Sequence, residues 1–150
     1  MNCSIPDWIV FASSSGGTQA GLAVGIGSDP KPKLLGISVD EPEAKLRNNV
    51  QSIAVDLIDQ LNNGTEISQA DILVSDDYTG EGYGILNDLD REAIHLFAEQ
   101  EGILLDPVYT ARAAGGMIDM IRKGFFKKDD LVLFRLWQGV YWDLYPFQSL

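Results

Sequence analysis

The chain has 150 residues, 45% of them hydrophobic and 22% charged, a composition typical of a soluble globular domain and not of a disordered segment. Its 22 acidic residues outnumber its 11 Lys and Arg residues, and the resulting net charge of −11 excludes nucleic acid as an expected partner. No apolar run approaches the roughly 20 residues that span a bilayer, and the amino terminus lacks a secretory pattern. We therefore expect a cytoplasmic protein that does not enter the membrane.

The first half of the chain alternates apolar runs with helical periodicity. Residues 8–12 form a continuous apolar run that ends at turn residues, as a buried strand does, and residues 34–39 repeat this pattern. A helix is predicted to begin at Thr18, and another after Asp40 and Pro42. The apolar side chains of this second helix share one face: Leu46, Val50, Ile53, Ala54, Leu57, Ile58 and Leu61.

The second half continues the same alternation. Residues 71–75 are a third predicted strand, and a polar, glycine-rich loop separates it from a helix over residues 88–101. Asp106 and Pro107 are expected to cap and open the next helix, and residues 131–136 are the last predicted strand. The apolar side of that next helix is predicted at Ala113, Met117, Met120 and Ile121.

Strands that alternate with helices predict a fold class of α/β, with a mostly parallel sheet between helices on both faces. No linker, repeat or low-complexity tract interrupts the pattern, so residues 1–150 are predicted to form a single α/β domain. In such sheets, ligands bind at the carboxyl ends of the strands.

The stretch SSSGGT, residues 13–18, follows the first predicted strand at such a carboxyl end. Glycines let the backbone approach a ligand closely, and the first N–H groups of the helix that follows have no internal acceptors. Those N–H groups and the helix dipole attract an anion, which indicates a phosphate-binding loop, although a tight turn with no ligand fits the same residues. The candidate phosphate contacts are Ser13, Ser14, Ser15, Gly16, Gly17 and Thr18.

Four segments together resemble one known family. In chain order they are SSSGGTQAGL, GEGYGILN, EGILLDPVYTARAAGGMIDMIRKGFFKKDD and VLF. They are similar to the carboxyl-terminal half of the D-cysteine desulfhydrase and 1-aminocyclopropane-1-carboxylate deaminase family, over about residues 8 to 134. That family has the tryptophan-synthase-β-like fold, a three-layer α/β architecture, and uses pyridoxal 5′-phosphate. The resemblance therefore implies this fold and this cofactor.

The resemblance also implies roles for individual residues. The loop of residues 13–18 would hold the cofactor phosphate, in agreement with its own chemistry. Tyr83 lies where the family places a tyrosine facing the substrate, and Tyr109 matches a second active-site tyrosine; such hydroxyl groups act as general acids or bases, or as orienting donors. Taken without their flanking residues, the two tyrosines fit half-buried packing. Thr110 is a further predicted cofactor contact, and because the desulfhydrases carry threonine there and the deaminases glutamate, the chain looks more desulfhydrase-like.

The sequence also departs from the family pattern. The Schiff-base lysine of the family belongs to the amino-terminal half, which this sequence does not match, and no lysine here stands in a similar context. Trp137 occupies about the place of a threonine that contacts the pyridine nitrogen, Leu86 replaces a proline, and Ser14 replaces a loop glycine. Because the lysine carries out the covalent chemistry, we expect no activity from this chain alone.

Other candidate sites favour ordinary structural roles. Asp76, Asp77 and Glu81 suit a hard metal ion, but an acidic solvated loop is the expected role and no metal is predicted. His95 lies one residue off the apolar face of its helix and is predicted at the surface. The single cysteine, Cys3, excludes an internal disulfide. Aromatic residues near the carboxyl end are predicted to pack in the core or at an interface: Trp137, Tyr141, Trp142, Tyr145 and Phe147.

Three functions remain open on the sequence. The first, which we favour, is a catalytically incomplete binding or interaction module that retains the phosphate loop and covers its bare apolar surface by homo-oligomerisation. The second is one part of a pyridoxal-phosphate dependent desulfhydrase or deaminase, completed by an amino-terminal half, that releases ammonia from a small amino acid by C–S or ring C–C cleavage. The third is the binding of a small phosphorylated ligand after loss of the chemistry, with cofactor binding either kept or lost.

Overall fold

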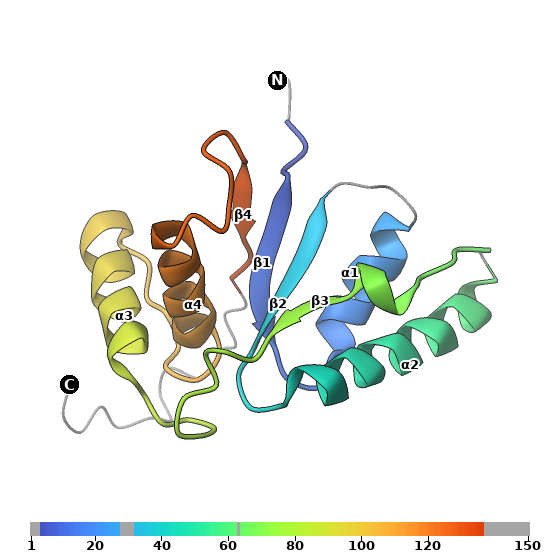
Figure 1. Cartoon of the computed structure of the whole chain (residues 1–150), viewed down its shortest axis with the longest axis horizontal. Helices are drawn as coiled ribbons and strands as arrows, with labels where there is room; N and C mark the ends of the chain where they lie inside the picture. Colours follow the sequence, from blue (N-terminus) through green and yellow to red (C-terminus); the bar gives the residue numbers. More distant parts are fainter. Residues whose placement is uncertain (1–3, 28–31, 63, 137–150) are drawn as a thin grey trace.

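The computed structural model describes residues 4–27, 32–62 and 64–136, and the statements below refer to these residues. Its strands are β1 (Trp8–Ser13), β2 (Lys33–Ser38), β3 (Leu73–Ser75) and β4 (Val132–Phe134). Its helices are α1 (Gly17–Ile26), α2 (Glu43–Leu61), α3 (Asp88–Glu101) and α4 (Thr110–Arg122), and a short 3₁₀ turn, η1, spans Gln69–Asp71. The strands form one parallel sheet in the order β3-β2-β1-β4 (Figure 1).

The central pair of strands aligns the apolar runs of the sequence. Val10 lies opposite Leu35 and Ala12 opposite Ile37, so the side chains of β1 and β2 alternate in step between the two faces. Because all the strand pairs are parallel, β1, β2 and β3 end at the same edge of the sheet. This carboxyl edge therefore gathers the loops that follow Ser13, Ser38 and Ser75.

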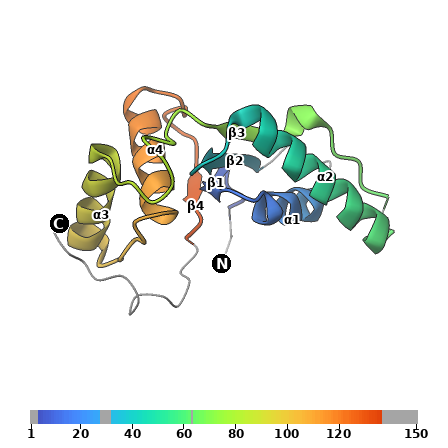
Figure 2. The ribbon, with the colours of Figure 1, turned by 90° about the horizontal axis from the view of Figure 1, so that it is seen from below.

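Helices lie on both faces of the sheet (Figures 1 and 2). On one face, α1 and α2 pack together through a cluster that comprises Ala20, Val24, Leu46, Val50, Ala54, Ile72 and Val74. On the other face, α4 packs on the strands and α3 packs against α4. The core beneath α4 comprises Val10, Leu35, Ile37, Tyr78, Ala113, Met117 and Met120. The predicted α/β fold with a covered parallel sheet is confirmed.

Two adjacent glycines allow α4 to lie close to its neighbours. A Cβ on Gly116 would lie 2.9 Å from Cδ2 of Tyr78, and a Cβ on Gly115 would lie 2.9 Å from the carbonyl oxygen of Leu89. These distances are shorter than a carbon contact allows, so any side chain would push α4 away. The glycines thereby hold the loop after β3 and the start of α3 against α4.

The predicted element ends are corrected in three places. The helix expected to open at Pro107 begins at Thr110, because the carboxylate of Asp106 holds a turn ahead of it. The strand expected over residues 71–75 begins at Leu73, since η1 occupies the residues before it. The strand expected over residues 131–136 covers only Val132–Phe134, which is the length that pairs with β1.

Two side chains of the predicted apolar helix faces are exposed instead. Leu61 and Ile121 belong to the last turns of α2 and α4, and both are more than half exposed. No helix in the described ranges is both long and apolar enough to cross a lipid bilayer. Our predictions for Cys3, and for the aromatic residues from Trp137 to Phe147, lie outside the described residues.

Candidate functional site

The loop of residues 13–18 turns the chain from the end of β1 into α1. Gly16 makes this turn with a left-handed φ of 88°, and a Cβ there would lie 2.9 Å from Cγ2 of Val50 in α2. A side chain at Gly16 is therefore disfavoured both by the backbone and by the neighbouring helix. Around Gly17, the first residue of α1, a Cβ would meet nothing within 4 Å, so the start of the helix is open.

The backbone N–H groups of this loop are available as donors. Among the described residues, none accepts a hydrogen bond from the N–H groups of residues 14–18, and the first helical bond runs from the N–H of Ala20 to the carbonyl of Gly16 at 2.9 Å. Several N–H groups at the positive end of a helix form a favourable site for an anion. The loop therefore presents the free donors that anion binding requires, and phosphate binding by it stays a prediction.

The hydroxyl groups of the loop divide into two kinds. The buried Ser13 donates to Oε1 of Gln19 at 3.1 Å, and Ser14 donates to Oδ2 of Asp40 at 3.0 Å. Ser15 and Thr18 are exposed. The first two hydroxyl protons thus hold the loop in shape, and phosphate contacts from the loop residues stay predictions.

Two tyrosines meet near the same edge of the sheet. The hydroxyl oxygens of Tyr83 and Tyr109 lie 2.6 Å apart, and their rings pack edge to face with centroids 5.9 Å apart. Tyr83 is 54% exposed and Tyr109 is 37% exposed, so both side chains lie partly at the surface. The hydrogen bond between Tyr109 and Tyr83, followed by partial burial, raises the pKa of Tyr109 to about 12. Tyr109 is therefore protonated at neutral pH.

Asp40 connects the loop to the tyrosine pair. It follows β2, its carboxylate accepts the hydrogen bond from Ser14, and its charge contributes to the raised pKa of Tyr109. A hydrogen bond therefore joins the loop after β1 to Asp40 after β2, and the charge of Asp40 acts on Tyr109 at the start of α4. The structure brings together Tyr83 and Tyr109, which were predicted as separate site residues.

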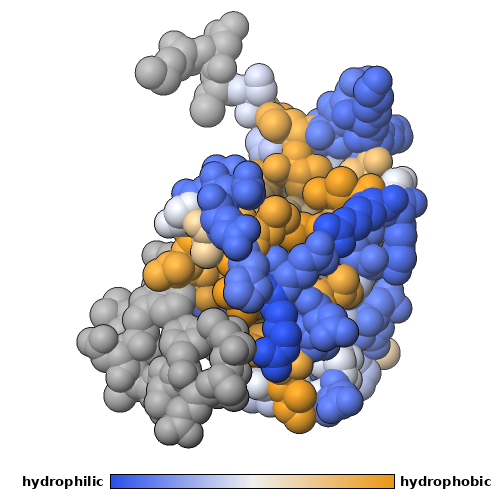
Figure 3. Space-filling view, turned by 90° about the vertical axis from the view of Figure 1, so that its left-hand side faces the viewer, coloured by the Kyte–Doolittle hydropathy of each residue, from blue (hydrophilic) through white to orange (hydrophobic). Residues whose placement is uncertain are grey.

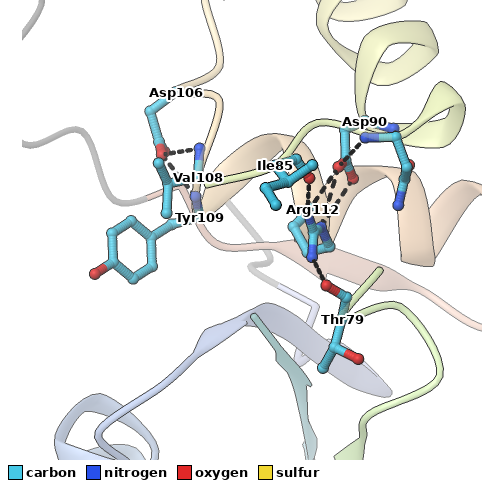
Figure 4. Close-up of polar contacts among 8 residues, drawn as sticks. Thr79, Ile85, Asp90, Asp106, Val108, Tyr109 and Arg112 are labelled. Carbon is cyan, nitrogen blue, oxygen red and sulfur yellow. Dashed lines mark hydrogen bonds and ion pairs between the residues drawn. The ribbon is translucent and has the colours of Figure 1, made fainter. Parts of the chain in front are cut away.

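Asp106 fixes the backbone that carries Tyr109 (Figure 4). Its Oδ1 accepts from the N–H groups of Val108 at 3.0 Å and Tyr109 at 2.7 Å, and its Oδ2 accepts from the N–H of Thr110 at 2.8 Å. The hydroxyl of Thr110 is buried; it donates to Oδ2 of Asp106 at 2.6 Å and accepts from the N–H of Asp106 at 2.7 Å. In this structure Thr110 serves the turn, and a cofactor contact from it stays a prediction.

Tyr83 is carried by the glycine-rich loop between β3 and α3, and a buried arginine supports that loop (Figure 4). Arg112 of α4 donates to the carbonyl groups of Thr79 and Ile85 and pairs with the carboxylate of Asp90. The sequence analysis missed Arg112 and Asp90. The available signal was an arginine within the otherwise small and apolar run ARAAGGM.

The acidic residues after β3 have structural partners. Oδ2 of Asp76 accepts from the N–H of Glu43 at 2.8 Å at the start of α2, and Oδ2 of Asp77 accepts from the hydroxyl of Ser75 at 3.2 Å. Within the residues described, no three His, Cys, Asp or Glu side chains gather in a way that could hold a metal ion. His95 is exposed on α3.

The fold and the site define an α/β protein with a candidate ligand site at the carboxyl edge of a parallel sheet. Comparison with known families matches residues 2–136 to the pyridoxal-phosphate dependent enzymes, and the chain belongs to that family. Curated relatives named 1-aminocyclopropane-1-carboxylate deaminase, from Burkholderia vietnamiensis and Burkholderia multivorans, are each 37% identical over 135 residues. A crystal structure of an ACC deaminase homologue superposes with a TM-score of 0.74 at 30% identity.

In each comparison the match covers a larger share of this chain than of the relative. It includes 89% of this chain but only 40% of each of those relatives and of the solved homologue. The family and the carboxyl-terminal correspondence predicted from the sequence are both confirmed. The chain thus spans about two fifths of the length of the relatives that it matches.

Proposed function

We propose that this chain forms the phosphate-binding side of a pyridoxal-phosphate dependent site and that it is catalytically incomplete by itself. The observation that carries the proposal is the open row of backbone N–H groups at residues 14–18, at the start of α1 and at the carboxyl edge of the sheet. Membership of the coenzyme-dependent family supports the choice of ligand. The coenzyme supplies an electron sink when it is bound.

The residues present fit the phosphate of this coenzyme. A phosphate needs several donors in a concave turn, and the N–H groups of residues 14–18 with the hydroxyl groups of Ser15 and Thr18 would supply them. The close approach of Gly16 to Val50 keeps the turn concave, since a side chain there would displace it. These residues bind and orient the ligand, and none of them takes part in bond making.

The tyrosine pair would donate a hydrogen bond to a ligand and would not act as a base. Two hydroxyls that share one hydrogen bond leave one O–H group available for a further acceptor. With its pKa raised to about 12, Tyr109 keeps its proton at neutral pH. The pair would therefore orient a bound amino acid or coenzyme oxygen by donation, or protonate it.

The lysines with known contacts support catalytic incompleteness. Lys33 lies 4.9 Å from the ring of Trp8 at the amino end of the strands, away from the loop after Ser13. Lys45 pairs with Glu41 at 2.7 Å, and Lys123 pairs with Asp119 at 2.6 Å. We infer that the lysine needed for covalent chemistry comes from a segment that these residues do not include.

Binding measurements on the pure chain test the proposal. Calorimetric titration with pyridoxal 5′-phosphate should show saturable binding that inorganic phosphate weakens by competition. The Gly16→Ala variant should lose this binding, whereas Gly25→Ala, which adds a methyl group in open space on α1, should keep it. If the native chain binds neither compound saturably, the phosphate-binding proposal is wrong.

A covalent-trapping experiment tests separately whether the chain is catalytically incomplete by itself. The chain is incubated with the coenzyme, reduced with borohydride and digested, and mass spectrometry then locates any modified lysine. We expect scattered, substoichiometric modification and no release of ammonia from D-cysteine or 1-aminocyclopropane-1-carboxylate. Stoichiometric labelling of one residue such as Lys45, together with turnover, would show that the chain is a complete enzyme.

One observation favours the second candidate, a catalytic part that another segment completes. The edge strand β4 leaves Leu133 half exposed beside the half-exposed Leu131, and apolar side chains lie open on the side of the molecule that carries α3 (Figure 3). Exposed apolar groups next to an edge strand suit a protein partner. Because the relatives are longer than this chain, we propose an amino-terminal part of the same enzyme family as that partner, with a second copy as the alternative.

Sedimentation of the chain, alone and with the amino-terminal part of a relative, distinguishes these partners. A complex that also releases ammonia from a small amino acid would support the catalytic part. A stable homodimer that the amino-terminal part does not alter would favour the interaction module. Monomers under both conditions at micromolar concentration would count against either partner.

A further inference from the structure

We propose that Arg112 is a positioning residue for the tyrosine pair: it fixes both ends of the loop of residues 79–85, so that the hydroxyl of Tyr83 reaches that of Tyr109. The contacts that position Tyr83 all lie within the described residues and require no bound ligand. That the pair serves a bound coenzyme rests on the proposed function.

The first support is the placement of the two backbone contacts. One terminal nitrogen of Arg112, Nη1, donates to the carbonyl oxygen of Thr79, and the other, Nη2, donates to that of Ile85 at 2.6 Å. These two carbonyls bracket the segment that carries Tyr83. One rigid, planar guanidinium group therefore sets the distance between the two ends of this segment.

The segment itself needs such an anchor. Gly80, Gly82 and Gly84 all have positive φ values, of 63°, 145° and 75°. Glycines have more backbone freedom than any other residue, so a segment with three of them has many accessible conformations. Contacts at its two ends select the conformation that presents Tyr83 to Tyr109.

The arginine is itself held in place. Its Nε lies 3.1 Å from both carboxylate oxygens of Asp90, and the two side chains are each 1% exposed. Asp90 also closes the start of α3, because its carboxylate accepts from the N–H of Asn87 at 2.9 Å while its own N–H donates to the side chain of Asn87 at 2.9 Å. A buried, fully bonded arginine has little freedom to change its position.

Both tyrosines are thus held in place by side chains at the start of the same helix, α4. Asp106 holds the N–H of Tyr109 at the start of α4, and Arg112 lies one turn further along that helix. Tyr109 is positioned by local backbone contacts, and Tyr83 by the side chain of Arg112. We therefore expect a change at Arg112 to separate the two hydroxyl groups without displacing Tyr109.

The first test replaces Arg112 by lysine, which keeps the charge but cannot reach both carbonyls and Asp90 together. The protein is labelled with carbon-13 at the tyrosine Cζ, which leaves the phenol unchanged, the Tyr109 resonance is assigned with Tyr109→Phe, and its alkaline titration is followed by carbon NMR. In Arg112→Lys the pKa of Tyr109 should fall from about 12 towards 10, the ordinary value for tyrosine. The matched control, Arg122→Lys, alters an exposed arginine of the same helix and should leave the titration unchanged.

A second variant covers the case in which Arg112→Lys does not fold. A Cβ on Gly80 would lie 3.3 Å from Nδ2 of Asn87 and 3.4 Å from Nη1 of Arg112, and the φ of 63° disfavours any side chain, so Gly80→Ala strains this end of the loop beside Arg112 and leaves the buried charge in place. Gly124→Ala is the matched control, because Gly124 has a similar φ of 73° with nothing within 4 Å. Gly80→Ala should lower the Tyr109 pKa, and Gly124→Ala should not.

The outcomes separate this inference from the proposed function. A folded Arg112→Lys or Gly80→Ala protein whose Tyr109 still titrates near 12 would overturn the positioning role. If the variants shift the titration but the native chain binds no coenzyme, the positioning role stands and the coenzyme proposal fails. If the native chain binds the coenzyme and the variants leave the pKa of Tyr109 unchanged, the coenzyme proposal stands and the positioning role fails.

Discussion

The hydroxyl oxygens of Tyr83 and Tyr109 lie 2.6 Å apart, although one tyrosine precedes α3 and the other follows it. Their supports differ: Arg112 holds the loop of Tyr83, and Asp106 holds the turn of Tyr109. The contact is therefore a sensitive measure of whether the carboxyl edge of the sheet is correctly assembled.

Removing one hydroxyl should change the titration of the other. The hydrogen bond with Tyr83 is the largest cause of the raised pKa of Tyr109, so in Tyr83→Phe this pKa should fall from about 12 towards 10. Carbon NMR of protein labelled with carbon-13 at the tyrosine Cζ measures this pKa without changing the phenol. The burial of Tyr78 and its hydrogen bond to Asp119 raise the pKa of Tyr78 independently, so that residue is an internal control. An unchanged Tyr109 titration in Tyr83→Phe would contradict the observed contact.

The same shift predicts a dependence of stability on alkaline pH. The unfolded chain releases the Tyr109 proton near pH 10, whereas the folded chain keeps it until about pH 12. Unfolding therefore becomes easier as the pH rises through this interval, because the unfolded state binds fewer protons. Urea midpoints at pH 9, 10 and 11 should fall less steeply for Tyr83→Phe than for the native chain. Parallel slopes would indicate that Tyr109 contributes nothing to the pH dependence.

Alanine at Gly16 should destabilise the protein, and alanine at Gly17 should not. Gly16 has a left-handed backbone, which costs a residue with a side chain about 1–2 kcal/mol, and the contact with Val50 adds to that cost. Gly17 begins α1 in open space, where a methyl group should stabilise by about 0.4–1 kcal/mol. Urea unfolding of both variants gives the comparison. Equal effects would mean that the loop does not have the described turn.

A second glycine pair should respond in opposite directions. Alanine favours a helix over glycine by about 1 kcal/mol, and Gly25→Ala in α1 should show this gain because its Cβ has open space. Gly116→Ala in α4 should instead lose about 1–3 kcal/mol from overpacking, since its Cβ would lie 2.9 Å from the ring of Tyr78. Thermal unfolding of the two variants measures the difference. A stabilised Gly116→Ala protein would show that α4 can move away from Tyr78.

Loss of the Asp106 carboxylate should loosen the start of α4. It accepts three backbone N–H groups and the hydroxyl of Thr110, and the loss of a helix cap costs about 0.5–2 kcal/mol. Asp106→Ala should therefore unfold at lower urea concentration and show faster amide exchange at Tyr109. Asp129→Ala removes the same charge from an exposed loop position and should change stability little. Similar losses for both variants would assign the effect to net charge.

Much of the fold follows from local sequence patterns. The helix predicted over residues 88–101 is confirmed at both ends, because Asn87 caps its start and Gly102 ends it in the left-handed conformation. The strand ends were predicted less well. For β3, the apolar run alone did not reveal that the residues before Leu73 turn as η1.

The site was predictable in its parts and not in its connections. The small residues between a strand and a helix predicted the turn of residues 13–18, and flanking motifs singled out Tyr83 and Tyr109, which the structure places in contact. Phosphate binding by the loop stays a prediction. The pair between Arg112 and Asp90 joins residues 22 positions apart on different helices, so no local pattern encodes it. The bond between Ser13 and Gln19 likewise depends on how β1 meets α1, and that geometry exists only in the folded chain.

The loop of residues 13–18 continues into α1 on one side of the sheet, while Tyr109 directly precedes α4 on the opposite side (Figure 2). A ligand bound both by the loop of residues 13–18 and by Tyr109 would connect the two helical layers across the carboxyl end of the strands. It would stiffen the two helical layers together, even though they share few direct contacts. Ligand binding would then slow deuterium uptake in both α1 and α4. In α2, which lies at neither contact, the uptake would slow only as far as the whole protein becomes more rigid.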